Sequence, residues 1–86
     1  MFLHITKIEM KKGSHEVKLF FNNNEAYTVN LFDSLSGEIF EPLRDDNLFK
    51  RGYLNPLTGT IEWENGADFA PEYLLDVAKK QHNIAA

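Results

Sequence analysis

The chain has 86 residues, 43% of them hydrophobic, with no cysteine and a formal net charge of −4. We expect one globular domain over residues 1–86, and the missing cysteines exclude disulfides and thiolate metal sites. The acidic balance disfavours nucleic-acid binding by this chain alone, because proteins that bind DNA or RNA usually carry a basic stripe.

Alternating apolar residues predict a three-stranded antiparallel meander in the N-terminal half. This alternation has the period of a half-buried strand. The expected strands are residues 2–10, 16–21 and 26–31. In the first of them the alternation changes phase between Ile5 and Ile8, which a β-bulge or partial cover of both faces explains.

The middle of the chain predicts short helical segments. Residues 31–37 are typical of a turn or 3₁₀ segment that ends at Gly37. Asp45–Gly52 begins with helix-capping residues and ends at a glycine, which predicts a helix of one to two turns. Such a short helix is not stable alone, so we expect Leu48 and Phe49 to dock it on the core.

The C-terminal half predicts a second β-hairpin and a helix. Tyr53–Asn55 and Thr60–Glu64 are the strands, with Ile61 and Trp63 facing inward and Thr60, Glu62 and Glu64 facing outward. A helix follows from Pro71, with Leu74, Val77 and Ala78 at helical spacing. The predicted fold is therefore α+β: an antiparallel meander, a second hairpin, a short middle helix and a C-terminal helix.

No pattern in the chain indicates catalysis or a cofactor. The three serines lie outside nucleophile-elbow sequences. The three histidines, His4, His15 and His82, lie in different elements and lack metal-ligand spacing. Glu62 and Glu64 lie about 7 Å apart on one strand face, and we interpret them as a solvated face. We expect a protein that is not an enzyme and holds no metal or cofactor.

Five residues are candidates for a partner surface: Phe20, Lys18, Arg44, Trp63 and Asp68. Phe20 lies opposite the apolar face of its strand, beside Lys18, so it is either an exposed aromatic or covered by another segment. Arg44 can pair with the neighbouring aspartates or grip an acidic partner. Trp63 is favoured as a core residue, with an interface anchor as the alternative.

Several segments together resemble the bacterial family catalogued as domain of unknown function 2442. The resemblance covers nearly the whole chain and is most specific from Trp63 to Pro71. Glu64 departs from it, because many relatives have proline there. The segments are Phe40–Asp45, Leu48-Phe49, Pro56–Thr60 and Ile61–Glu72.

The resemblance implies a small α+β domain with no assigned catalytic residues. It also implies a partner protein, often encoded beside it, in a manner similar to toxin–antitoxin pairs. Some relatives carry an added helical DNA-binding segment, for which we expect no room in 86 residues.

We therefore expect a non-catalytic, antitoxin-like interaction module that binds a small, basic protein, with strand-edge addition as the natural mode. One alternative is a small-molecule or metal-binding domain at a homodimer cleft around Trp63, Asp68 and Arg44. Another is a DNA-binding regulator. We see neither a signal peptide nor a membrane-spanning run in the sequence and expect a cytoplasmic protein.

Overall fold

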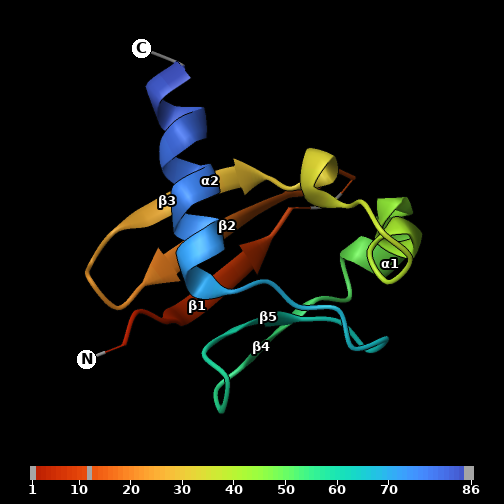
Figure 1. The fold of residues 1–86 in the computed structure, drawn as a ribbon, viewed down its shortest axis with the longest axis horizontal. Coiled ribbons are helices and arrows are strands. Elements are labelled where there is room, and N and C mark those ends of the chain that lie inside the picture. Colours follow the sequence, from red (N-terminus) through yellow and green to blue (C-terminus); the bar gives the residue numbers. More distant parts are fainter. Residues whose placement is uncertain (1, 12, 85–86) are drawn as a thin grey trace.

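The structure is a computed structural model that describes residues 2–11 and 13–84. Strands β1 (Ile5–Met10), β2 (Glu16–Phe21) and β3 (Ala26–Asn30) form an antiparallel sheet in the order β1-β2-β3 (Figure 1). Along β2 every second residue is buried, as the sequence pattern predicts. The register between β1 and β2 shifts between Ile5 and Lys7, which confirms the predicted irregularity.

The middle of the chain consists of short helical turns. They are the 3₁₀ turns η1 (Phe32–Ser34) and η2 (Glu41–Arg44) and helix α1 (Asp46–Phe49). The Asp45 side chain caps α1 by accepting a hydrogen bond from the backbone N–H of Asn47 at 2.8 Å.

The expected docking of α1 is half correct. Phe49 is fully buried, but Leu48 is 38% exposed, which corrects the prediction that both residues reach the core. Neighbouring residues of a helix point about 100° apart, so α1, which turns Phe49 fully inward, leaves Leu48 at the edge of the buried face.

Strands β4 (Tyr53–Asn55) and β5 (Thr60–Glu62) form the predicted second hairpin. The hairpin lies against the start of β1, where the N–H of Ile5 donates to the carbonyl of Gly59 at 2.7 Å (Figure 1). Thr60 was expected to face solvent but is only 4% exposed. The returning chain covers Thr60, and its hydroxyl donates to the carbonyl of Phe69.

Helix α2 (Pro71–Ile84) closes the fold. It crosses the sheet at β3, and its C-terminal end projects beyond that strand (Figure 1). Leu74 and Ala78 are buried, and Gln81 exchanges two hydrogen bonds with the backbone of Asn30 on the edge of β3. No helix in the described part of the chain is long and apolar enough to cross a bilayer.

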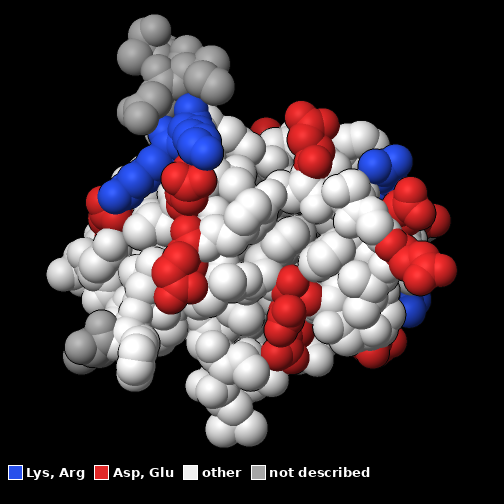
Figure 2. Space-filling model, viewed as in Figure 1, with Lys and Arg blue, Asp and Glu red and all other residues white. Residues whose placement is uncertain are grey.

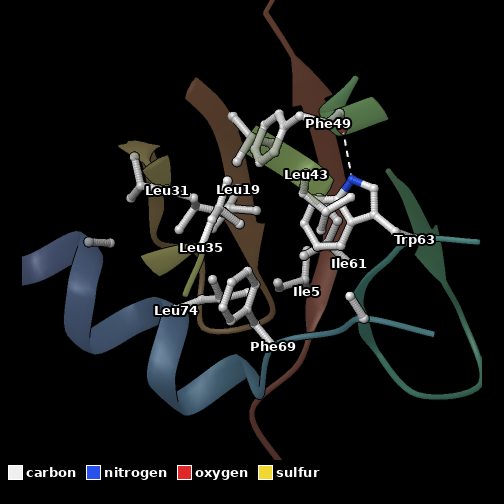
Figure 3. Packing of buried hydrophobic residues seen from close by; sticks show 14 of the residues in the cluster. Ile5, Leu19, Leu31, Leu35, Leu43, Phe49, Ile61, Trp63, Phe69 and Leu74 are labelled. Atoms are coloured by element: carbon white, nitrogen blue, oxygen red, sulfur yellow. Dashed lines mark hydrogen bonds between the residues drawn. The ribbon is translucent and has the colours of Figure 1, made fainter. Parts of the chain in front are cut away.

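One hydrophobic core joins the two sheets, the middle turns and α2 (Figure 3). It contains residues from every one of these parts, and the two-stranded sheet in particular depends on it, because an isolated hairpin is only marginally stable in water. The fold is therefore the predicted α+β class. The largest fully buried side chains are Phe49, Ile5, Leu19, Leu31, Leu35, Ile61 and Leu74.

Candidate functional site

An open groove lies between the middle turns and the end of the second hairpin, and we call it the Trp63 groove. Its volume is about 210 Å³. The residues that line it come from η2, from α1 and the residues just after it, and from the chain that follows β5. Its apolar lining is Pro42, Leu43, Leu48 and Trp63, with Arg51, Glu64 and Asn65 at the rim.

The floor of the groove is held rigidly because Trp63 is fixed on several sides. Its indole N–H donates to the carbonyl of Phe49 at 2.8 Å (Figure 3). The rings of Trp63 and Phe49 lie 5.4 Å apart. Gly52 lies so close that a Cβ built on it would be 2.8 Å from Nε1 of Trp63. Trp63 is only 2% exposed, and it lines the groove with this small exposed part.

Asn65 ties the rim of the groove to the middle segment. Its side-chain amide donates to the carbonyl of Ile39 at 2.8 Å, while its side-chain oxygen accepts from the N–H of Ala67 at 3.1 Å. Gly66 has a φ of 91°, a left-handed conformation that glycine adopts without strain. The turn after β5 is thus held in one geometry beside the groove.

His15 holds the opposite wall, a role that the sequence did not reveal. The ring is 9% exposed; Nε2 lies 3.1 Å from the carbonyl oxygen of Leu43 and Nδ1 lies 3.2 Å from Oδ1 of Asp46. Its ring also packs 4.9 Å from Phe32 and 4.8 Å from Phe49. One side chain from the β1–β2 turn therefore anchors both η2 and α1. In the sequence His15 has only the features of a turn residue.

The middle segment also carries the net charge of the protein. Residues 31–49 contain five carboxylates and one guanidinium, a balance of −4, while the rest of the chain has eight acidic and eight basic residues. All five carboxylates are exposed. Figure 2 shows acidic side chains gathered at the end of the molecule where α1 lies. The five carboxylates of residues 31–49 are Asp33, Glu38, Glu41, Asp45 and Asp46.

The structure separates the predicted surface residues into two regions. Phe20 and Lys18 lie on the outer face of the three-stranded sheet, where Lys7 and Lys18 place their ammonium groups 5.3 and 5.1 Å from the Phe20 ring centre. Phe20 is half-buried, between the two states that the sequence left open. Nothing in these contacts joins this face to the Trp63 groove.

The other three candidates lie around the middle segment and β5. Arg44 forms no ion pair with a described carboxylate, which corrects the expected pairing with the neighbouring aspartates. Its Nε donates to the carbonyl of Leu35 at 2.8 Å, and its guanidinium lies 5.7 Å from the ring centre of Phe32. Asp68 is exposed and forms an isolated β-bridge with Glu62. Trp63 alone reaches the groove.

The two glutamates of the second hairpin have different surroundings. Glu62 accepts hydrogen bonds from Asn55 at 3.0 Å, Thr58 at 3.0 Å and Tyr53 at 3.5 Å. The bond from Asn55 has the largest effect; with the other two it outweighs desolvation and lowers the pKa of the Glu62 carboxyl below its ordinary value. Glu64 follows the strand and lies at the rim of the groove. Glu62 therefore has a structural role in the hairpin.

The histidines lie in separate places. His4 contacts the carbonyl of Phe2 at 3.1 Å, and the His82 ring packs against Tyr27 at 4.8 Å. Within residues 2–11 and 13–84, no three histidine, aspartate or glutamate side chains gather as ligands for a metal ion.

Fold and site together define a small α+β domain with an apolar groove beside an acidic segment. The chain matches a family model over residues 5–80 and belongs to that family, described as "Protein of unknown function (DUF2442)". The resemblance noted from the sequence is thereby confirmed. No curated protein matches the chain.

A solved structure has the same fold. It is the crystal structure of NE0471 from Nitrosomonas europaea ATCC 19718, described as a candidate DNA-binding protein. The two superpose with a TM-score of 0.79 at 21% sequence identity, over 95% of this chain and 52% of NE0471. The chain thus spans about half the length of NE0471, and at this identity the likeness concerns the fold alone.

Proposed function

We propose that this protein is a non-catalytic interaction module that binds a small, basic protein, as an antitoxin binds its toxin. The observation that carries the proposal is the Trp63 groove beside the exposed acidic segment. An open apolar surface next to a concentrated charge of one sign is a common feature of partner-binding sites. The proposal places the protein in the cytoplasm with its partner.

The size of the groove favours a protein partner over a small molecule. Its volume of about 210 Å³ is below the roughly 300–1,000 Å³ of pockets that enclose drug-sized ligands. A groove of this size instead accepts one side chain of a partner, with the surrounding surface completing the contact. A groove of this volume disfavours the alternative of a metabolite site around Trp63.

DNA binding receives less support. The name of NE0471 suggests it, but this chain spans about half of that protein. Affinity for DNA comes largely from cations that neutralise phosphates, whereas this chain has a net charge of −4. A DNA-binding regulator would also show affinity that falls steeply with salt, which makes that alternative easy to test.

Co-expression with the product of the neighbouring gene tests the proposal. We expect the two proteins to co-purify through size-exclusion chromatography as one complex at micromolar concentration. Two separate peaks at that concentration would contradict the proposal. A parallel titration with duplex DNA at low salt should show no binding, and saturable binding there would favour the regulator instead.

A further inference from the structure

We propose that the Trp63 groove receives one large apolar side chain of the partner, and that lysines or arginines flank this anchor in the partner sequence. This inference rests on the proposed function and specifies the chemistry of the partner. Three observations support it: the pairing of the backbone around the groove, the exposed apolar lining, and the charges at the rim.

The backbone around the groove is already paired. The backbone N–H of Trp63 donates to the carbonyl of Ala67 at 2.9 Å, and the backbone carbonyl of Trp63 accepts from the N–H of Gly66 at 2.9 Å. The returning chain therefore occupies this edge of the second hairpin. On the α1 side, the backbone N–H groups of Arg51 and Gly52 donate to the carbonyls of Leu48 and Phe49. Strand addition needs an unpaired backbone edge, so a partner at this groove is recognised through side chains.

The edges of the larger sheet are partly occupied as well. Gln81 bonds both the N–H and the carbonyl of Asn30 on β3, at 3.0 and 2.8 Å, as a neighbouring strand would. On β1, the N–H of Ile5 bonds to Gly59. These contacts occupy the Asn30 end of β3 and the Ile5 end of β1, so strand-edge addition, the binding mode expected from the sequence, is blocked at those two positions.

The apolar lining gives the anchor its place. Leu48 is 38% exposed, although Phe49, the next residue of α1, is fully buried. Pro42 and Trp63 line the same space. A phenylalanine or leucine from the partner would remove the exposed part of Leu48 from water, and such burial is the main favourable contribution at interface centres.

Charges at the rim select the residues beside the anchor. Glu64 and Arg51 both line the groove, and neither forms an ion pair with another described residue. The acidic segment at residues 31–49 contributes Pro42, Leu43 and Leu48 to the lining and has a balance of −4, which Lys50 and Arg51 directly after it reduce to −2. The overall field attracts basic residues, while Arg51 repels a cation at one position and so fixes the register of the partner segment.

Peptide titrations followed by NMR test the inference on the full-length protein. The probe is a short synthetic peptide with one central phenylalanine between lysines and arginines. Trp63 is the single tryptophan, so its indole N–H gives one assigned signal at the groove floor. We expect saturable shifts of this signal and of the Leu48 and Arg51 amides. No shifts at millimolar peptide would overturn the inference.

Two control peptides separate the anchor from the charge. Replacing the phenylalanine by serine should weaken binding by roughly tenfold or more, the factor for one buried large apolar side chain. Replacing the cations by glutamates should abolish binding. Equal affinity of the serine peptide would mean that charge alone is recognised and would contradict the anchor.

Matched variants of the protein test the residues. Leu48→Ser should weaken binding of the phenylalanine peptide. Leu57→Ser should leave it unchanged, because Leu57 is 94% exposed and lies outside the groove. Glu64→Lys should weaken binding and Arg51→Glu should strengthen it, each by roughly two- to fivefold for an exposed charge pair. Stronger binding by Glu64→Lys and weaker binding by Arg51→Glu would refute the roles assigned to these two charges at the rim.

The two proposals fail in different ways. Absence of a complex with the neighbouring gene product counts against the proposed function, whatever the peptides do. A complex that forms and keeps its affinity with Leu48→Ser and Glu64→Lys supports the proposed function and overturns the anchor at this groove.

Discussion

Gly52→Ala should destabilise the fold through a direct contact with the floor of the groove. A Cβ at this position would lie 2.8 Å from Nε1 and 2.9 Å from Cε2 of Trp63, and 3.2 Å from Cδ1 of Ile61. Because the indole is hydrogen-bonded to Phe49 and buried, it cannot move aside cheaply. Overpacking of this kind costs about 1–3 kcal/mol.

A second effect of the same substitution has the opposite sign. Alanine restricts the unfolded chain more than glycine does, which stabilises a protein by about 0.4–1 kcal/mol where the native backbone accepts it. No left-handed φ is recorded at Gly52, so this gain applies. We therefore expect Gly52→Ala to lower the free energy of unfolding by about 0.5–2 kcal/mol net.

A double-mutant cycle isolates the contact. Trp63→Leu removes both indole atoms that an alanine at residue 52 would meet. In that background the two closest contacts are gone and only the 3.2 Å approach to Cδ1 of Ile61 opposes the unfolded-state gain, so the same glycine substitution should be close to neutral. The coupling free energy between the two positions should be about 1–3 kcal/mol, since the unfolded-state effect cancels in the cycle.

Urea unfolding followed by far-ultraviolet circular dichroism measures the cycle, because this signal does not depend on the tryptophan. A domain of this size has a stability of roughly 4–13 kcal/mol, so both single variants should remain folded. Equal destabilisation by Gly52→Ala in the two backgrounds would show that the indole contact is not the cause, and that the free-energy cost of the substitution arises elsewhere around residue 52.

Three further predictions concern the elements around the groove. Folding lowers the pKa of Glu62, so its carboxylate adds stability above the unfolded pKa near 4.3, and this stability is lost as the pH falls through the folded pKa. Glu62→Gln removes this contribution and should reduce the loss of stability between pH 7 and pH 3. An unchanged slope in urea titrations over that range would contradict this. Asp45→Ala should cost about 0.5–2 kcal/mol as a lost helix cap, and a change below 0.2 kcal/mol, on the order of assay error, would argue against the cap. His15→Phe keeps the ring packing but removes the contacts to Leu43 and Asp46, so it should cost about 1–3 kcal/mol; a more stable variant would contradict the proposed anchoring role.

The sequence predicted the regular elements because their signals are local. Alternation along β2 and helical spacing along α2 follow from burial of one face, and both recur in the structure. Asp45 was predicted as part of a helix start because capping chemistry acts within three residues.

The groove was not predicted because it depends on contacts between distant segments. Trp63 and Phe49 are fourteen residues apart, and His15 and Leu43 are twenty-eight apart. Leu48 was assigned to the core because sequence pattern does not say which of two adjacent apolar residues faces inward on a single helical turn. Arg44 was paired with its sequence neighbours, whereas in the structure it packs on Phe32 across the turn.

We propose above that this protein binds a basic partner through the Trp63 groove. Isothermal titration of the neighbouring gene product with the wild-type protein, Leu48→Ser and Leu57→Ser tests it most directly. The account predicts that only Leu48→Ser weakens the complex, by roughly tenfold or more, the factor for one buried apolar contact. Equal affinities for all three proteins would contradict it.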